Sequence, residues 1–372
     1  MKLLYAFPEP LPLRRARGIQ AVNSAAALAE GGIDLEFAYV PVGSEDPFAY
    51  YGVPKPALLK STPISRSLPW PLGRIHSNKW FAARLLRKID LTKTVFYVRH
   101  LKLAALLAAN PGKPRFIYEA HEVFADTAPA GKALERREEE LRVMRSADAI
   151  VSNSGATAKR LIELYGNPKV LEVIPNGVAR SETLPQKDWT HPGDHITYSG
   201  SLFPWKGAAD LVTAAASLPG CTIEIIGGES DRVAELQAGV IETGAKVRFT
   251  GHLPHAQALE HLYAACIAVL PNRADTDSEF TSPIKLFEYM AAGCAIVASD
   301  LPPMHEVLDK DDALWTRPGD PQSIASAISV LVQDPALARR LGDRVREKSR
   351  QFTWQARAER VKALLAKIGE QR

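Results

Sequence analysis

Short apolar runs alternate with longer amphipathic stretches along the whole chain of 372 residues. A run that is apolar at consecutive positions predicts a strand buried on both faces, and apolar residues three or four apart predict a helix that covers it. In the first half the predicted strands span residues 2–7, 35–40, 94–98, 115–119, 149–152 and 170–174. In the second half they span residues 195–199, 222–226, 246–250, 267–270, 295–299 and 313–315. This alternation is typical of an α/β fold with parallel sheets.

The amphipathic stretches between the strands predict the helices. In the first half they span residues 19–30, 78–88, 101–109, 132–145 and 156–165. In the second half they span residues 208–217, 232–242, 256–265, 283–292, 321–333, 335–350 and 354–367. The Pro-rich stretch over residues 41–72 shows no clear period, and a loop of that length is usually functional or mobile.

The length of the chain favours two domains. Composition turns polar over residues 179–194, with two prolines, a glycine and mixed charge, which indicates a linker. We therefore expect an N-terminal domain over residues 1–178, a C-terminal domain over residues 195–350 and a final helix over residues 351–372.

Positive charge is concentrated in the first half of the chain. The net charge is +4, yet residues 55–102 hold eleven basic residues and one acidic residue, with Trp70, Trp80 and Phe81 among them. Basic residues with interleaved aromatics suit an anionic membrane surface or a lipid-linked acceptor. A solvated basic face is the alternative. Nucleic acid is not expected as a partner, because no recognition fold accompanies the patch.

The three cysteines, Cys221, Cys266 and Cys294, stand singly in apolar settings, which indicates reduced core residues of a cytosolic protein. No stretch reaches the roughly 20 apolar residues of a membrane-spanning helix. We therefore expect a cytoplasmic protein, peripheral on the inner face of the membrane if the basic segment binds there.

The segment over residues 281–293 has the pattern of a helix that opens onto an anion. We expect Ser282 to cap the helix and Pro283 to occupy its first position, where a missing N–H costs nothing. The first free N–H groups of the helix would then face an anion together with the charge of Lys285. Glu288 follows three residues later, nearly above Lys285, where a carboxylate can accept sugar hydroxyls. The pattern favours a nucleotide-sugar site, and an ordinary capped surface helix is the alternative.

Four stretches resemble, in the expected order, the retaining glycosyltransferases of the GT-B fold, the large family 4 group. They are Tyr118–Glu122 (YEAHE), Val173–Val178 (VIPNGV), Tyr198–Gly207 (YSGSLFPWKG) and Thr281–Gly293 (TSPIKLFEYMAAG), the last followed by Ile296–Pro302 (IVASDLP). The resemblance implies two Rossmann-like domains that face each other across a cleft, with a terminal helix that crosses back onto the first domain.

The resemblance also assigns roles to single residues. His121 is implied to contact the donor sugar, Lys206 to neutralise the departing diphosphate, and Glu288 to bind the ribose. The other implied donor-binding residues are Gly200, Ser201, Gly228, Leu253, Glu279, Phe280, Thr281, Ser282, Pro283, Ile284 and Lys285. On the acceptor side the candidates are Arg17, Gly18 and Arg99. Glu119 and Glu122 flank His121, and a carboxylate beside the imidazole would raise its pKa, but the sequence leaves open which one reaches it.

The chain departs from the family pattern at two positions. Ser201 stands where the family usually has an arginine, and Phe280 stands where the first glutamate of a Glu-x7-Glu pair is expected. Glu279 lies one residue off that register. Either Glu279 contacts the donor sugar after a small shift, or backbone N–H groups near Phe280 and Thr281 bind the sugar.

Together these patterns predict transfer of a hexose or N-acetylhexosamine from a UDP- or GDP-linked donor to a glycan or lipid-linked acceptor, in polysaccharide or glycolipid synthesis. We expect no cofactor and no metal, because the chain has no HEXXH motif and no clustered Cys and His. A sugar-nucleotide epimerase of the same fold is one alternative. A non-catalytic nucleotide-sugar-binding protein is another, favoured by the departures at positions 201 and 280.

Overall fold

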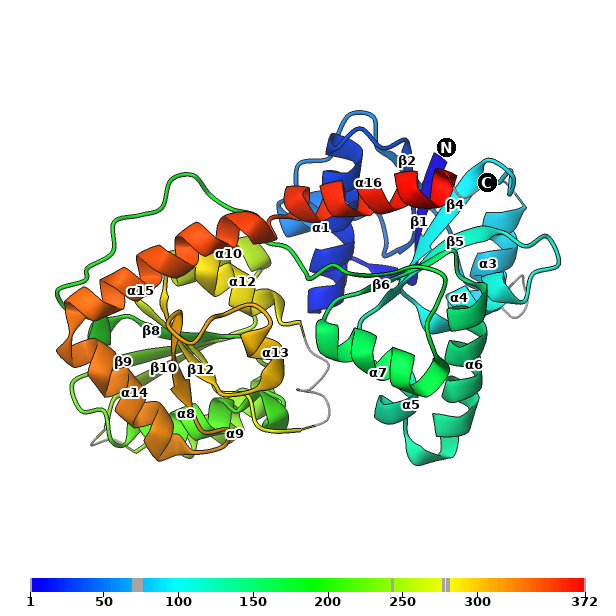
Figure 1. The fold of residues 1–372 in the computed structure, drawn as a ribbon. Helices are drawn as coiled ribbons and strands as arrows, with labels where there is room; N and C mark the ends of the chain where they lie inside the picture. The colour runs from blue at the N-terminus through cyan, green and yellow to red at the C-terminus, as the bar shows by residue number, and fades with distance from the viewer. Residues whose placement is uncertain are drawn as a thin grey trace. The chain divides into compact units, whose positions relative to one another are not determined.

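Two parallel sheets organise the chain (Figure 1). The computed structural model describes residues 2–68, 76–87, 89–241, 244–275, 278 and 282–370. The chain divides into unit 1, which contains Met1–Gly177 and Trp354–Arg372, and unit 2, which contains Val178–Thr353. Two Rossmann-like parallel-sheet units confirm the predicted fold class.

Unit 1 is built on a sheet of seven parallel strands in the order β3-β2-β1-β4-β5-β6-β7. The strands are β1 (Lys2–Leu11), β2 (Leu35–Pro41), β3 (Lys60–Pro63), β4 (Thr94–Val98), β5 (Arg115–Ala120), β6 (Ala149–Ser152) and β7 (Leu171–Val173). The helices are α1 (Ala16–Glu30), α2 (Pro47–Tyr51), α3 (Asn78–Leu86), α4 (Leu101–Ala108), α5 (Phe124–Thr127), η1 (Ala130–Lys132), α6 (Ala133–Ser146), α7 (Gly155–Tyr165) and the C-terminal α16 (Trp354–Glu370).

Unit 2 is built on a sheet of six parallel strands in the order β10-β9-β8-β11-β12-β13. The strands are β8 (Ile196–Ser199), β9 (Thr222–Ile226), β10 (Lys246–Gly251), β11 (Ile267–Leu270), β12 (Ala295–Ser299) and β13 (Ala313–Thr316). The helices are η2 (Pro192–Asp194), η3 (Pro204–Lys206), α8 (Ala208–Ala215), α9 (Ser230–Gln237), α10 (His255–Ala264), α12 (Ile284–Ala291), α13 (Pro302–His305), α14 (Pro321–Gln333), α15 (Pro335–Lys348) and η4 (Ser349–Phe352).

All twelve predicted strands lie within a residue or a few of the observed ones, because a strand buried on both faces is a continuous apolar run. The stretch over residues 41–72, in which no period was visible, nevertheless holds α2 and β3. β3 escapes the pattern because it is a short edge strand whose side chains are half-buried or exposed. α2 does carry a local signal, since Asp46 caps it by accepting a hydrogen bond from the N–H of Phe48 (3.0 Å).

The segment over residues 179–194, predicted as a linker, packs on unit 2. Lys187 donates a hydrogen bond to the carbonyl of Ala265, and the thiol of Cys266 lies 3.3 Å from the carbonyl of Asp188. All three cysteines are free and buried. The polar composition therefore coincides with the first segment of unit 2 and not with a free linker. Lys187 contacts the unit through its ammonium group and Asp188 through its backbone carbonyl, and neither contact requires an apolar residue that the sequence would show.

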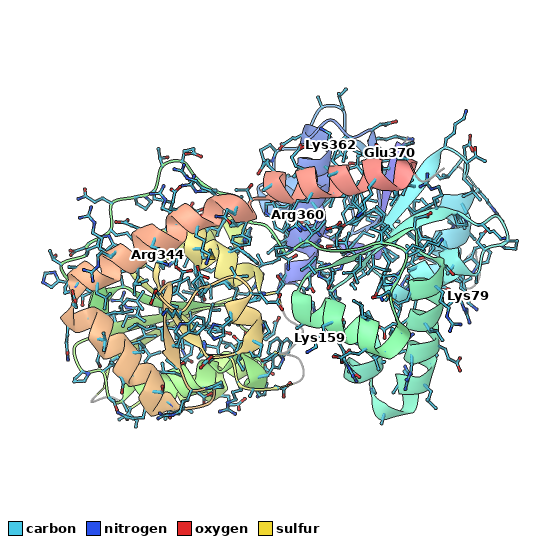
Figure 2. The ribbon with its side chains drawn as sticks, viewed as in Figure 1. Lys79, Lys159, Arg344, Arg360, Lys362 and Glu370 are labelled. Carbon is cyan, nitrogen blue, oxygen red and sulfur yellow. The ribbon has the colours of Figure 1, made fainter. Side chains whose placement is uncertain are left out.

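The terminal helix α16 belongs to unit 1, where it packs along α1 (Figure 1). Trp354, its first residue, is buried. Arg360 and Lys362 lie on the same helix (Figure 2) and donate to the carbonyls of Val173 (2.6 Å) and Gly31 (2.8 Å), both in unit 1. The predicted return of the chain to its first domain is confirmed. Among the described residues, no helix combines the length and hydrophobicity needed to span a bilayer.

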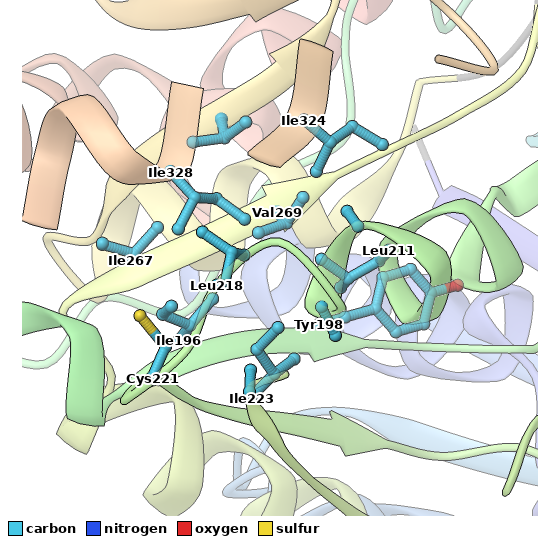
Figure 3. Close-up of a cluster of buried hydrophobic side chains, with 14 of the residues drawn as sticks. Ile196, Tyr198, Leu211, Leu218, Cys221, Ile223, Ile267, Val269, Ile324 and Ile328 are labelled. Atoms are coloured by element: carbon cyan, nitrogen blue, oxygen red, sulfur yellow. The ribbon is translucent and has the colours of Figure 1, made fainter. Parts of the chain in front are cut away.

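One core cluster of unit 2 lies between its sheet and the helices α8 and α14 (Figure 3), and a second one lies between the sheet and the helices α10, α12 and α15. Ile196 and Ile267 extend from adjacent strands toward Leu211 of α8 and Ile328 of α14, and all four are almost fully buried. Each such side chain contributes about 1.5–3 kcal/mol on burial. This packing holds the carboxyl ends of the strands, and the loops that follow them, in a fixed arrangement.

Candidate functional site

The loops after β8 and β11 lie where the unit 2 sheet changes direction. β8 and β11 are neighbours, and the chain leaves them toward opposite edges of the sheet. Open parallel sheets bind ligands beyond the carboxyl ends of the strands at such a point. The N–H of Arg273 donates to the carbonyl of Trp205 (2.9 Å), which joins the two loops. Gly207 packs so tightly on Pro271 that a Cβ would lie 1.7 Å from the proline carbonyl oxygen.

Lys285 lies against the backbone of Gly200. A Cβ on residue 200 would lie 1.4 Å from the Lys285 Nζ, so a larger residue there would displace this ammonium group. The Nζ also lies 4.8 Å from the ring centroid of Tyr198. Burial lowers the pKa of Lys285 to about 8, against the opposing effect of Glu288. The structure thus brings together two of the predicted donor-binding residues, Gly200 and Lys285, at the end of β8.

The predicted start of the helix α12 was wrong by one residue. The helix begins at Ile284, and Pro283, in an extended conformation with ψ 116°, takes the N-cap position that we expected for Ser282. The fixed φ of proline is compatible with either position, so the sequence could not decide between them. The N–H of Leu286 donates to the Pro283 carbonyl (3.0 Å), so it does not face outward. The predicted residues Glu279, Phe280 and Thr281 lie outside the described residues.

Glu288 is buried and paired with a histidine that the sequence did not reveal. The Nε2 of His255, the first residue of α10, donates to Oε1 of Glu288 at 2.8 Å. Burial alone would lower the pKa of His255, but the hydrogen bond and charge of Glu288 outweigh it and raise that pKa. The two residues are 33 positions apart, and no local pattern connects them.

Lys206 is the last residue of the short helix η3. Its Nζ lies over the ring of the preceding residue, Trp205, 3.6 Å from the ring centroid. Ser201, which stands in place of the family arginine, accepts a hydrogen bond through its carbonyl from the hydroxyl of Tyr198 (2.6 Å). Both residues are on the loop that Arg273 holds in place. Their roles toward a donor stay predictions.

Two further predicted donor-binding residues, Gly228 and Leu253, lie on two other loops of unit 2. Gly228 follows β9 with φ +92°, and a Cβ there would come within 2.3 Å of Leu202. Leu253 is half-buried between β10 and α10. The N–H of Gly227 donates to the carbonyl of Gly251 (2.8 Å), which joins these two loops.

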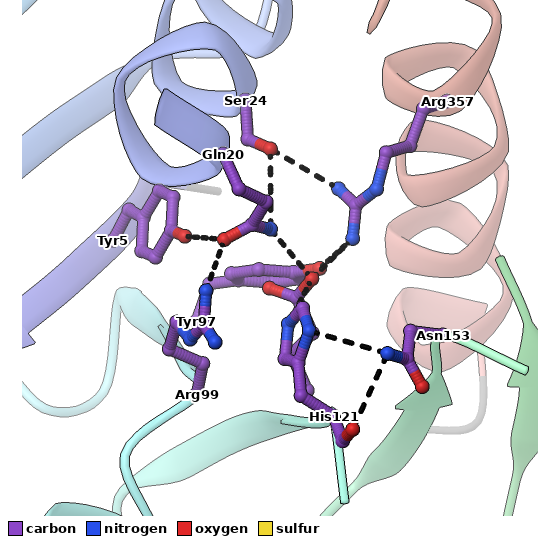
Figure 4. Close-up of polar contacts among 9 residues, drawn as sticks. Tyr5, Gln20, Ser24, Tyr97, Arg99, His121, Asn153 and Arg357 are labelled. Carbon is purple, nitrogen blue, oxygen red and sulfur yellow. Dashed lines mark hydrogen bonds and ion pairs between the residues drawn. The ribbon is translucent and has the colours of Figure 1, made fainter. Parts of the chain in front are cut away.

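In unit 1, His121 follows β5 directly and lies in a buried polar cluster (Figure 4). Its Nε2 is 2.9 Å from Oε1 of Glu119, and its Nδ1 is 3.4 Å from Nδ2 of Asn153. The other candidate carboxylate, Glu122, instead accepts from the hydroxyl of Thr127 (2.7 Å). The structure therefore decides that Glu119 is the partner.

The expectation that a carboxylate would raise the pKa of His121 was wrong. Burial and the nearby charge of Arg99 outweigh Glu119 and lower this pKa to about 4. His121 is therefore neutral at neutral pH. The direction of this pKa shift could not be predicted from the sequence. The sequence shows the carboxylates that flank His121, but it shows neither the burial of the ring nor the proximity of Arg99 and Arg357.

The three acceptor-side candidates lie on two elements of unit 1. Arg99 follows β4 and donates to Oε1 of Gln20 (2.7 Å), which places it in the same cluster as His121 (Figure 4). Arg17, in the first turn of α1, pairs with Glu9 (2.6 Å). Gly18 is a packing glycine, since a Cβ would lie 2.1 Å from the hydroxyl of Tyr51.

The basic segment over residues 55–102 is spread over β3, α3, β4 and α4 rather than forming one element. Some of its charges have partners: Lys60 pairs with Glu36 (3.1 Å), and Arg84 donates to the carbonyl of Ser65 (2.6 Å). Trp70 lies outside the described residues. Binding to a membrane stays a prediction.

The two halves of the chain match two glycosyltransferase families. Residues 18–182 match the family described as "Glycosyltransferase Family 4", and residues 193–334 match "Glycosyl transferases group 1". The chain is 30% identical to the glycogen synthase of Mycobacterium tuberculosis over 242 residues, which make up 61% of this chain and 56% of that protein. It is 24% identical to the D-inositol 3-phosphate glycosyltransferase of Nocardia farcinica over 323 residues, 79% of this chain and 66% of that protein. The chain thus spans between about half and two thirds of the length of these curated relatives.

Solved structures share the fold over the full chain. Anabaena HepE in complex with UDP aligns with a TM-score of 0.76 and 17% identity, over 99% of this chain and 100% of that chain. The sucrose-phosphate synthase of Thermosynechococcus elongatus aligns with a TM-score of 0.77 and 18% identity, over 100% of both chains. Likeness at these identities is a likeness of fold, and the fold is GT-B.

Proposed function

The chain belongs to the group 1 and family 4 glycosyltransferases of the GT-B fold, and from that membership we propose that it is a retaining glycosyltransferase. It transfers a hexose or N-acetylhexosamine from a nucleoside diphosphate sugar to a hydroxyl of a glycan or lipid-linked acceptor. The observation that carries the proposal is the close approach of Lys285 to Gly200 at the end of β8. An ammonium group held against bare backbone, beside the start of a helix, favours a diphosphate.

The chemistry follows from the charges in unit 2. As the bond between the anomeric carbon and the phosphate oxygen breaks, negative charge grows on the diphosphate, and Lys285 and Lys206 stabilise it. Glu288 accepts the ribose hydroxyls. The acceptor hydroxyl attacks from the face that the phosphate leaves and gives its proton to a phosphate oxygen, so the configuration is retained. This scheme requires no separate enzymatic base.

Two lysines with a helix N-terminus supply the positive charge that a divalent metal provides in other transferases, so we propose that the reaction needs no metal. A UDP-linked donor is favoured, because the structurally similar HepE was solved in complex with UDP and with UDP-glucose. The basic segment over residues 55–102 supports an acceptor presented at an anionic membrane surface, as in polysaccharide or glycolipid synthesis. The enzyme would then work as a peripheral protein on the cytoplasmic face.

The test is release of nucleoside diphosphate from a panel of UDP-, GDP- and ADP-linked sugars. Wild type is compared with Lys285→Met and Glu288→Gln. Lys246→Met is the matched control, because Lys246 is exposed at the amino end of β10, the opposite end of the sheet. We expect release from one donor, lost in the two site variants, kept in the control and unchanged by EDTA.

Other results would overturn parts of the proposal. Tight nucleotide binding without release, with or without a panel of acceptors, would favour a non-catalytic binding protein. Turnover of the nucleotide sugar to its epimer would favour an epimerase. Release that EDTA abolishes and Mn²⁺ restores would contradict the metal-independent scheme.

A further inference from the structure

The C-terminal helix reaches the histidine cluster of unit 1 through a single buried side chain, Arg357. This residue lies on α16 and is only 4% exposed, although arginine is almost never buried without partners. Its guanidinium forms an ion pair with Glu119 and lies 3.3 Å from the hydroxyl of Tyr97 and 3.4 Å from that of Ser24 (Figure 4). The arginine is therefore built into the cluster rather than placed at its edge.

The partner of Arg357 is also the partner of His121. Glu119 is fully buried, and its Oε1 accepts from Arg357 and from Nε2 of Gln20 (2.7 Å) and lies 2.9 Å from Nε2 of His121. One carboxylate oxygen thus connects a helix at the end of the chain to the histidine at the end of β5. The two ends of this connection are more than 230 positions apart in the sequence.

The cluster already holds more positive than negative charge. Glu119 supplies one negative charge, whereas Arg357 and the half-buried Arg99 supply two positive ones. The other titratable groups that face the cluster are Tyr5 and Tyr97, and burial raises their pKa values, so both stay neutral. A proton on His121 would add a third cation to a region of low dielectric, which is strongly unfavourable.

We propose that Arg357 is a positioning residue that pairs with Glu119 and compensates its negative charge, so that His121 stays neutral, with its proton on Nε2 and its ring in a fixed orientation. The terminal helix α16 then contributes a residue to the candidate active site in addition to packing on α1. The inference rests on the proposed function only in giving His121 a place beside the donor sugar. The ion pair and the protonation of His121 can be measured without any substrate.

The protonation of the two partners agrees with this assignment. Burial would raise the pKa of Glu119, but the charges of Arg357 and His121 outweigh it and hold that pKa well below its ordinary range. Nε2 of His121 lies 2.9 Å from the ionised carboxylate of Glu119, and its Nδ1 faces the amide nitrogen of Asn153, a donor, at 3.4 Å. A carboxylate beside Nε2 and an amide donor beside Nδ1 both favour the tautomer with its proton on Nε2. The histidine is thus restricted to one tautomer.

The experiment is a pH titration followed by ¹⁵N NMR on full-length protein labelled at histidine, with the His121 signal assigned from a His121→Asn variant. The variants are Arg357→Met, Arg357→Lys and Arg360→Met. Arg360 is the matched control, because it ties the same helix to the carbonyl of Val173 without touching Glu119.

We expect wild type and Arg360→Met to keep a neutral His121 with a pKa of about 4. In Arg357→Met, Glu119 has lost its permanent cation, so His121 binds a proton more readily and its pKa rises from about 4 toward the ordinary value of about 6.5. Arg357→Lys restores the charge and lowers the pKa again. An unchanged His121 pKa in Arg357→Met, or the same rise in Arg360→Met, would overturn the proposal.

If Arg357→Met does not fold, a double variant still tests the proposal. The double variant Glu119→Gln with Arg357→Met contains neither buried charge. The proposal predicts that its His121 becomes a mixture of Nε2–H and Nδ1–H tautomers, because an amide can donate as well as accept. A single Nε2–H tautomer in the double variant would show that the carboxylate does not select it.

Donor turnover separates this inference from the proposed function. In Arg357→Met we expect kcat to fall at least about tenfold with little change in KM for the donor, while Arg360→Met matches wild type. If wild type turns over no donor, the proposed function fails, whereas the NMR result still decides the role of Arg357.

Discussion

Two histidines in this protein lie at nearly the same distance from a buried carboxylate, yet their pKa values are shifted in opposite directions. In unit 1, His121 lies 2.9 Å from Glu119, and its pKa is lowered to about 4. In unit 2, His255 lies 2.8 Å from Glu288, and its pKa is raised. The distance to the carboxylate therefore does not decide the protonation of the histidine.

Burial lowers the pKa of both histidines, and the difference between them comes also from what else the carboxylate contacts. Glu119 is already paired with Arg357, and Arg99 lies close by, so a proton on His121 adds unbalanced charge. Glu288 has no such guanidinium partner among the described contacts, and the proton on His255 completes a pair. A carboxylate beside a histidine gives a net increase of the histidine pKa only if burial and nearby permanent cations do not outweigh it.

The largest effect should come from removing the arginine that makes the two sites differ. We expect Arg357→Met to lower the free energy of unfolding by about 3 kcal/mol at pH 7.5, because it leaves a buried carboxylate without its permanent partner. Part of this loss should return below pH 6, when His121 can take its place. Urea denaturation measures the change, and the double variant with Glu119→Gln should be more stable than the single one. A double variant as unstable as Arg357→Met would contradict the explanation.

The free energy of unfolding should fall as the pH is lowered, because the pKa of His121 is lower in the folded protein than in the unfolded chain. Between pH 7.5 and 5 the unfolded histidine, with an ordinary pKa of about 6.5, binds a proton that the folded one does not. The stabilising contribution of the folded, low-pKa histidine is complete above pH 6.5 and is lost as the pH falls toward 4. We expect the free energy of unfolding to fall by about 2 kcal/mol at pH 5, measured by urea denaturation across this range. His121→Asn should flatten the slope, and an equally steep slope in that variant would refute the assignment.

Diphosphate binding in unit 2 should depend on pH through Lys285. Its pKa of about 8 means that the ammonium group loses its proton between pH 7 and 9 in the free protein. We expect the affinity for UDP to fall about tenfold over this range, because the anion binds the protonated form. Isothermal titration calorimetry would measure this. Lys285→Met should bind weakly at every pH, and Lys246→Met should keep the slope. A slope that survives in Lys285→Met would assign the titration to another group.

The smallest effect should come from the second histidine. The pKa of His255 is raised, so its pair with Glu288 is fully stabilising below the ordinary histidine pKa and weakens as the pH rises through the folded value. His255→Gln should therefore lower the free energy of unfolding by about 1 kcal/mol at pH 6 and by less at pH 8.5. The sign of the pH dependence is opposite to that of His121→Asn. The same sign in both variants would remove the contrast between the two sites.

Much of the fold could be predicted because its signals are local. Parallel strands buried on both faces leave continuous apolar runs, and helices leave a helical period, so β4, β9 and α14 were predicted at their observed ends. The resemblance of Tyr198–Gly207 and Thr281–Gly293 to a known family identified the candidate donor loops. β3 carries no such run, since an edge strand is paired on one side only.

The sequence by itself thus determined the two parallel-sheet units and several of the candidate site residues, whereas the return of α16 was implied only by the resemblance to a family. Only the tertiary structure decided which charges meet: Arg357 with Glu119, His255 with Glu288, and Lys285 with the backbone of Gly200. The physical reason is that ion pairing and desolvation depend on distance in space and on burial. Neither leaves a periodic trace along the chain, so the protonation of the site is a property of the packed protein.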